Sequence, residues 1–223
     1  ADATDAALLG ALAIAGREDA ERWGAERARV TFVAMGRYGG RECSYASDAD
    51  VIALHEAVGG ASDSEAAASA TAIVNRVKKL LGSATSQLGI VVDLDLRPEG
   101  KNGPMSRTIA SHEEYAQRWA STWERQAAVR ARPIGDGELA QAARSLFESM
   151  AYRDVSEAEV RDIRLLKARM ENERLPRGTE PARHVKLGPG GLTDVEWTIQ
   201  LIQMRHGREV EALRTSSTTD AIA

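Results

Sequence analysis

Two aspartates separated by one residue, Asp48 and Asp50, are the side chains of this 223-residue chain best suited to chemistry. They begin an apolar stretch, Val51–Leu54, whose length and composition predict a β-strand. Residues two apart in a strand point to the same face, so the two carboxylates should lie side by side. Like charges this close are costly unless a cation lies between them. The pair therefore predicts a site for a hard divalent cation such as Mg²⁺.

A glycine-rich segment precedes the two aspartates. An apolar run of strand length, Val30–Met35, leads into Gly36, Gly39 and Gly40, and a short polar connection follows. Carboxylate oxygens near a glycine-rich backbone suit Mg²⁺ that carries nucleotide phosphates. Glycines followed by Asp-x-Asp between two strands resemble the nucleotidyltransferase active site of the DNA polymerase β superfamily. The pattern leaves open a tight hairpin whose aspartates are solvated turn residues.

A third apolar segment supplies further charged side chains. Within the predicted strand over residues 90–97, residues 92–97 alternate between apolar and charged types, which places Asp93, Asp95 and Arg97 on one face. A two-metal phosphoryl-transfer site needs another carboxylate near the first two. We expect that residue to be Asp93, with Asp95 as the second choice, and an ordinary solvated face is the alternative. Arg97 and Lys101 are candidates for phosphate contacts, and a plain surface role is an equal alternative for Lys101.

Composition narrows the function classes. The formal net charge is −4, so no basic excess points to nucleic-acid binding as the main function. Cys43 is the only cysteine, which excludes an intrachain disulfide and agrees with a reducing compartment. No signal segment or long uncharged apolar run is present, which argues against secretion and membrane insertion and predicts a cytoplasmic protein. Residues 218–221 resemble the start of another helix, so we expect a fragment of a longer protein.

The order of the patterns predicts an α+β fold. We expect a polymerase β-like nucleotidyltransferase sheet with helices in residues 1–107, followed by a helical bundle in residues 108–223, because strand signals vanish after Ser106. Helical patterns cover Asp5–Glu26, Glu65–Leu81, a segment opening at Ser111, Glu138–Met150, Ser156–Leu175 and a segment ending at His206. The helix that opens at Ser111 carries an aromatic stripe, which is more often core than ligand platform: Tyr115, Trp119 and Trp123.

Charged residues in the helical part need partners. Glu124, Arg125, Arg130 and Arg132 lie among apolar residues, so some of these charges must be paired or face a site. A glycine turn at residues 188–191 leads into a helix with acidic residues near its start. This turn is either a plain helix cap or a second polar contact to a nucleotide or partner.

Four separated motifs together resemble the glutamine synthetase adenylyltransferase family, the bifunctional adenylylating and deadenylylating enzymes. In chain order they are Met35–Glu42 with Ser47–Asp50, Asp93–Gly100, Trp123–Arg132 and Lys186–Trp197. The resemblance implies one of two nucleotidyltransferase units, each a small α/β domain followed by a helical bundle. One unit transfers AMP from ATP to a tyrosine of glutamine synthetase, and the other removes AMP by phosphorolysis and gives ADP.

The Trp123–Arg132 run is closer to the C-terminal, adenylylating unit. Two departures weigh against that assignment: Arg37-Tyr38 stands where Lys-Leu is more usual, and Asp95 stands where a basic residue is frequent. The deadenylylating unit and a non-catalytic interaction module therefore stay open. A uridylyltransferase acting on PII shares the catalytic motif, but the Lys186–Trp197 motif favours the adenylyltransferase family.

The resemblance also implies roles. Asp48, Asp50 and Asp93 would be catalytic and would hold Mg²⁺, or Mn²⁺, on the phosphates of ATP. Asp93 would also orient or deprotonate the tyrosine hydroxyl. Backbone N–H groups of the glycines would approach the triphosphate. The implied nucleotide-binding residues are Gly39, Gly40, Ser47, Arg97 and Lys101. The implied partners are glutamine synthetase as protein substrate and, through the parent chain, a PII signal protein, with no nucleic acid and no membrane.

Overall fold

A computed structural model of the chain describes residues 1–44, 47–82, 89–174, 178 and 180–223. By their internal contacts they form two compact units, Ala1–Ala120 with Arg130–Phe147, and Ser121–Val129 with Glu148–Ala223. The predicted domain boundary after residue 107 is not tested by this division, because the compact units are defined by contacts and first separate after Ala120. The predicted α+β class is confirmed: the first unit contains a mixed sheet with helices, and the second is helical.

The first unit is organised around a five-stranded sheet of order β3-β2-β1-β5, with β4 also paired to β2. Strands β1 (Ala28–Ala34) and β2 (Ala49–Ala57) are antiparallel neighbours along the whole length of β1. Strand β5 (Arg132–Pro133) pairs with β1. Strands β3 (Val92–Asp93) and β4 (Ser106–Arg107) both run parallel to β2 at its other edge.

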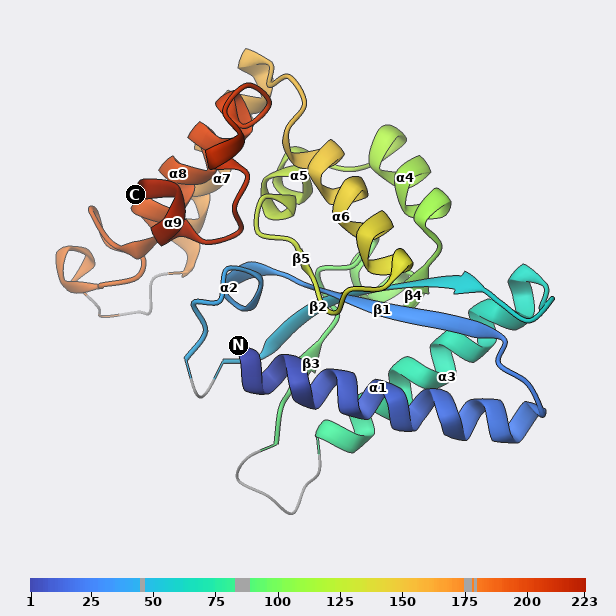
Figure 1. The fold of residues 1–223 in the computed structure, drawn as a ribbon. Coiled ribbons are helices and arrows are strands. Elements are labelled where there is room, and N and C mark those ends of the chain that lie inside the picture. The colour runs from blue at the N-terminus through green and yellow to red at the C-terminus, as the bar shows by residue number, and fades with distance from the viewer. Residues whose placement is uncertain (45–46, 83–88, 175–177, 179) are drawn as a thin grey trace. The chain divides into compact units, whose positions relative to one another are not determined.

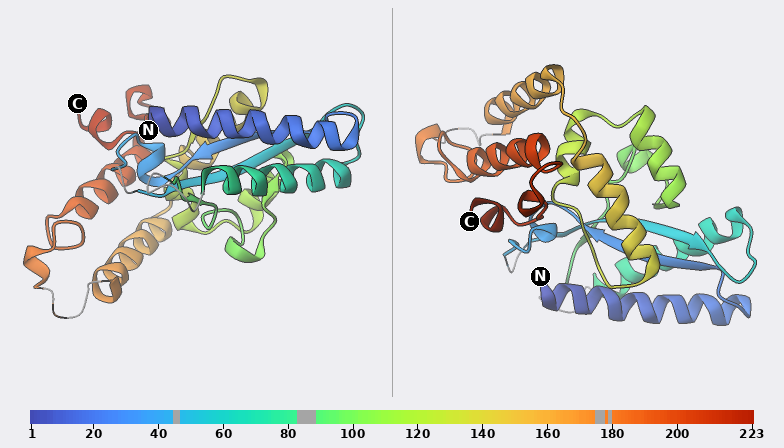
Figure 2. Two further views of the ribbon diagram at one scale, coloured as in Figure 1. Left: turned by 90° about the horizontal axis from the view of Figure 1, so that it is seen from below. Right: turned by 45° about the horizontal axis from the view of Figure 1, so that its top comes forward.

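Two helices cover one face of this sheet. Helices α1 (Asp2–Trp23) and α3 (Asp63–Leu81) lie side by side there (Figures 1 and 2). Alternate residues of the strands point into the core that these helices close, among them Phe32, Val51 and Val92. Because side chains alternate across a strand, Asp50 points to the opposite face. Helix α4 (Ile109–Arg118) and the N-terminal part of α6 (Glu138–Ala151) lie on that opposite side (Figure 1).

Helix boundaries follow local capping chemistry. The predicted caps before α3 form a capping box, in which the Ser62 side chain accepts from the Glu65 amide while Glu65 accepts from the Ser62 amide. The box predicted at Ser156 and Glu159 is confirmed at the start of α7. The remaining helices are α2 (Gly36–Gly39), α5 (Thr122–Ala128), α7 (Glu157–Arg174), α8 (Leu192–His206), α9 (Thr218–Ile222) and three 3-10 turns, Gly100–Asn102, Pro181–Arg183 and Glu211–Leu213. The predicted end of α7 at Leu175 lies outside the described residues.

Three predictions about the chain after residue 90 are wrong. The predicted strand over residues 90–97 is only two residues long, because the backbone turns after Leu94. Strand pairing does not vanish after residue 106, since β4 and β5 join the sheet. The helix expected to run on from Ser111 breaks between α4 and α5, and the side chains of Trp119 and Trp123 are exposed rather than core. Within the described part of the chain, no helix has the length and apolar character needed to span a membrane.

Candidate functional site

The register between β2 and β3 brings two of the predicted catalytic carboxylates together. Asp50 is the direct partner of Asp93 in this parallel pair, just as Ala49 is the partner of Val92. Partners in register lie on adjacent strands about 4.8 Å apart and point to the same face. Val92 and Leu94 are buried in the core under the two helices, so Asp93 between them points to the other face, with Asp50. The geometric condition for a shared site is met for this pair.

Asp48 lies at the edge of the same site. It comes directly before β2, two residues from Asp50, and the hydrogen bond from the Ala49 amide to the Val91 carbonyl (2.8 Å) holds this part of the backbone in place. The Asp48 side chain is exposed. Among the residues that the structure describes, no three His, Cys, Asp or Glu side chains are grouped as a metal ion would need. The Asp48 carboxylate would therefore have to rotate toward Asp50 and Asp93 before all three could share an ion.

The glycine turn formed by residues 36–40 lies against Asp50. A Cβ added to Gly36, whose φ is +53°, would stand 3.2 Å from Asp50 Oδ2. The two glycines predicted to approach phosphate are placed differently. Their amides donate within α2, from Gly39 to the Met35 carbonyl (2.8 Å) and from Gly40 to the Gly36 carbonyl (3.1 Å), and both residues are buried. The residue that lies beside the carboxylates is thus Gly36, which sequence reasoning did not single out for this role.

Gly39 has a different structural requirement. A Cβ at this position would meet the Arg130 carbonyl oxygen at 1.9 Å and the Ala34 carbonyl oxygen at 2.7 Å. Only a residue without a side chain fits where the backbone leading into β5 passes this closely. Gly39 is therefore explained by packing.

Two arginines hold the turn. Arg130 donates to the Gly36 carbonyl (3.1 Å) and to the Glu42 carboxylate (2.6 Å), and Arg132 donates to the Gly39 carbonyl (3.1 Å). Arg132 also makes a two-pronged ion pair with Asp5, with distances of 2.8 and 3.0 Å. Of the two expectations for these arginines, ion pairing is confirmed, because Arg130 pairs with Glu42 and Arg132 with Asp5.

A partly buried acid, Asp5, and a buried phenol, Tyr38, complete this support. The Tyr38 hydroxyl donates to Asp5 (2.6 Å), and burial together with that bond raises the pKa of Tyr38 above its ordinary value. Burial alone would raise the pKa of Asp5, but the hydrogen bonds from Arg132 and Tyr38 outweigh it and hold this pKa below the ordinary value. The carboxylate is thus kept ionised opposite Arg132.

The other predicted nucleotide-binding residues make local contacts. The Arg97 side chain is 10% exposed and donates to the carbonyls of Leu94 (2.9 Å) and Gly103 (3.2 Å), so it braces the loop after β3. Lys101 is 81% exposed and pairs with Asp95 at 3.2 Å. The Ser47 hydroxyl accepts from the Ser44 amide (2.9 Å). The contacts described for Arg97, Lys101 and Ser47 therefore lie within their own loops.

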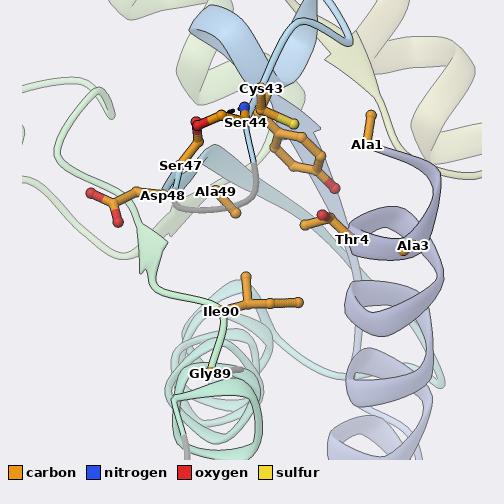
Figure 3. Close-up of a pocket in the computed structure, with 11 residues that line it drawn as sticks. Ala1, Ala3, Thr4, Cys43, Ser44, Ser47, Asp48, Ala49, Gly89 and Ile90 are labelled. Atoms are coloured by element: carbon orange, nitrogen blue, oxygen red, sulfur yellow. Dashed lines mark hydrogen bonds between the residues drawn. The ribbon is translucent and has the colours of Figure 1, made fainter. Parts of the chain in front are cut away.

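A cavity of about 460 Å³ lies on the other side of β2. Figure 3 shows the Asp48 carboxylate pointing away from Cys43 and Thr4, whose side chains line the cavity. Ala49 lines it too, and its side chain points toward the core face rather than toward Asp50. This cavity is therefore not the place where the carboxylates converge. Its described lining residues are Ala1, Ala3, Thr4, Tyr38, Cys43, Ser44, Ser47, Asp48, Ala49, Gly89 and Ile90.

In the second unit, the glycine turn before α8 is a helix cap. Asp194 accepts from the Gly190 amide (2.6 Å) and pairs with Lys167 of α7, and the Thr193 hydroxyl donates to the Lys186 carbonyl. These contacts use the polar groups of the motif within the fold, which supports the plain-cap interpretation.

Comparison with known proteins gives a consistent set of relatives. The model of the family described as glutamate-ammonia ligase adenylyltransferase matches residues 2–146. A Streptomyces coelicolor protein named bifunctional glutamine synthetase adenylyltransferase/adenylyl-removing enzyme is 46% identical over 226 residues, which cover 100% of this chain and 22% of the relative. Proteins of the same name from Bifidobacterium longum (47% over 228 residues, 99% and 21% covered) and Mycobacterium marinum (44% over 220 residues, 97% and 22% covered) are also similar. The chain spans about a fifth of the length of these relatives.

Proposed function

Because the chain belongs to the glutamate–ammonia ligase adenylyltransferase family, we propose that it is a nucleotidyltransferase unit that moves AMP from ATP to a tyrosine hydroxyl of glutamine synthetase and releases diphosphate. One observation carries the chemical part of this proposal. Asp50 and Asp93 are register partners on the same face of the sheet, and Asp48 lies two residues before Asp50. The match of four motifs to the family carries the choice of acceptor.

The donor set suits Mg²⁺, with Mn²⁺ as a substitute. Carboxylate oxygens are hard ligands of the kind these ions prefer. Asp50 and Asp93 would hold the ion from their fixed backbone positions, and Asp48 would join by rotation of its exposed side chain. When bound, the ion would neutralise charge on the triphosphate of ATP.

Asp93 has a second task in this proposal. A tyrosine hydroxyl has a pKa near 10, so most of it is protonated at neutral pH and a nearby base aids its attack. Asp93 accepts a hydrogen bond from the Asp95 amide (2.7 Å), which fixes one carboxylate oxygen and leaves the other to orient the hydroxyl or accept its proton. Lys101, on the exposed loop after β3, would meet the phosphates.

The deadenylylating activity is the second candidate, because the relatives are named for both activities. The same aspartates would then serve phosphorolysis of adenylyl-tyrosine, with inorganic phosphate as the attacking group and ADP as product. The Trp123–Arg132 run, closer to the adenylylating unit, favours the first candidate. A PII signal protein would act on either activity through the parent chain.

Two assays run side by side test the proposal. In the first, the chain is incubated with ATP, Mg²⁺ and unmodified glutamine synthetase, and we expect diphosphate release and AMP on the synthetase. In the second, adenylylated synthetase and inorganic phosphate replace these substrates, and ADP formation would favour the alternative. Replacing ATP with UTP tests the alternative that the chain is a uridylyltransferase.

Matched aspartate variants link the activity to the site. Asp50→Asn and Asp93→Asn should each abolish transfer, because one ligand oxygen of the shared ion loses its charge. Asp154→Asn is the control, since this carboxylate is exposed and pairs with Arg208 in the second unit. Binding of the synthetase without turnover of either substrate would instead identify a non-catalytic interaction module.

A further inference from the structure

The glycine turn beside Asp50 is hydrogen-bonded by two arginines that are far away in sequence, Arg130 and Arg132. Arg130 lies two residues before β5 and Arg132 begins it, about 90 residues after α2, and β5 pairs with the end of β1 at Ala34. Their guanidinium groups reach three carbonyls of the turn, those of Gly36, Tyr38 and Gly39.

These contacts are buried and specific. The Arg130 side chain is 4% exposed and joins the Gly36 carbonyl to the Glu42 carboxylate, whose side chain is 25% exposed. A planar guanidinium can donate to a carbonyl and a carboxylate at once, which a lysine ammonium does with less directional control. Arg130 therefore fixes both the start of the turn at Gly36 and the chain that leaves it at Glu42.

Gly36, whose carbonyl accepts from Arg130, is the residue of the turn that lies beside Asp50. Gly36 lies so close to Asp50 that an added Cβ would be 3.2 Å from Oδ2, and the Met35 amide donates to the Asp50 carbonyl at 2.9 Å. A displacement of Gly36 therefore acts directly on the side chain and the backbone of Asp50.

We propose that Arg130 and Arg132 are positioning residues of the nucleotide site, which hold the glycine turn so that Gly36 stays against Asp50. This proposal rests on the proposed function for the identity of the ligand, a nucleoside triphosphate with a divalent cation. Each arginine acts through backbone carbonyls, Arg130 more closely because it holds Gly36 itself.

The test compares Arg130→Lys with a matched control. Mn²⁺ binding in the presence of ATP is measured on the whole chain by electron paramagnetic resonance, and KM for ATP and kcat are measured in the transfer assay. Arg130→Lys should raise the Mn²⁺ half-saturation concentration and KM about tenfold, since one charge-assisted bond to the turn is weakened. Thermal unfolding shows that the variant is folded at the assay temperature.

Arg125→Lys is the control. Arg125 is as buried as Arg130, at 4% side-chain exposure, but pairs with Glu159 and the Met150 carbonyl in the second unit. It should lower the unfolding temperature without changing Mn²⁺ binding. If Arg130→Lys does not fold, Glu42→Gln replaces it, because this variant keeps the shape and removes only the charge that orients Arg130, with an expected rise of about threefold.

The outcomes separate the two proposals. Unchanged Mn²⁺ binding in a folded Arg130→Lys chain, or an equal rise in Arg125→Lys, overturns the positioning role. If the unaltered chain binds Mn²⁺ and ATP through Asp50 but transfers nothing to the synthetase, the proposed function fails while the positioning role is still tested by the binding data. No Mn²⁺ binding in the presence of ATP by the unaltered chain overturns both the site and the positioning role.

Discussion

Substitution of Gly39 by alanine should strongly destabilise the first unit. The added Cβ would stand 1.9 Å from the Arg130 carbonyl oxygen, whereas ordinary contact begins at 3.4 Å. The oxygen belongs to backbone, so the strand entry at Arg130 has to move as a whole. That movement strains the hydrogen bond from Arg130 to Gly36 and the pairing of Ala34 with Arg132. Overpacking costs about 1–3 kcal/mol, and each weakened buried hydrogen bond adds about 1 kcal/mol, so we expect a loss of about 3 kcal/mol or more.

Urea unfolding followed by circular dichroism measures this loss. For a chain of this size, about 3 kcal/mol corresponds to a fall in Tm of about 6–12 °C. Gly10→Ala is the matched control, because nothing lies within 4 Å of its Cβ position in the middle of α1, and alanine should stabilise that helix by up to about 1 kcal/mol. The experiment also separates two explanations of Gly39. If Gly39→Ala were as stable as the unaltered chain and only bound ATP less well, the packing explanation would be wrong.

Three further outcomes follow from the geometry. Burial would raise the pKa of Glu159, but the bonds from Ser156 and Arg125 lower it to about 2, so its stabilising effect is lost as the pH falls from about 4.5 toward 2, and Glu159→Gln should flatten this limb of the stability curve. Burial lowers the pKa of His112 from 6.5 to about 4, so the unfolded chain takes up a proton first and stability falls between pH 6.5 and 4; His112→Leu should remove that slope in urea titrations. Lys101→Ala should change stability by less than about 0.5 kcal/mol, because its pair with Asp95 is exposed, and an unchanged KM for ATP would favour the plain surface role.

The sequence was sufficient to predict the two long strands, β1 and β2, and the capping boxes of two helices. Strand β1 contains the segment Val30–Ala34, which is apolar except for Thr31, and strand β2 contains the apolar run Val51–Leu54. The capping boxes at Ser62 and Ser156 are local patterns that need no tertiary information. The prediction that Asp48 and Asp50 lie side by side used the alternation of a strand, but only Asp50 lies on β2 and Asp48 comes directly before it. The approach of Asp93 to Asp50 required the pairing of β2 with β3, which the sequence indicated only as a possibility.

The parts that were mispredicted depend on tertiary contacts. Strands β4 and β5 are two residues each, too short to show any period, and they exist because β1 and β2 offer open edges. The aromatic spacing before Arg125 matched a continuous helix, but the chain breaks after Trp119, whose side chain is 74% exposed. Arg130 could be predicted to need a partner, but its partners, the Gly36 carbonyl and Glu42, lie too far away in sequence for any local pattern to identify them.

The position of the acidic site is set by apolar burial. A shift of β3 by one residue would send every side chain to the opposite face. Asp93 would then enter the core and Val92 or Leu94 would face Asp50. Both apolar residues are at most 5% exposed, and moving either into water while burying an unpaired carboxylate would cost several kcal/mol. The core under α1 and α3 thus fixes the register that pairs Asp93 with Asp50, and it does so without any contribution from the carboxylates, whose mutual repulsion opposes the pairing. The buried face of this strand pair therefore keeps two acids together despite their repulsion. A site that binds a cation between carboxylates needs such a fixed pair before the cation arrives.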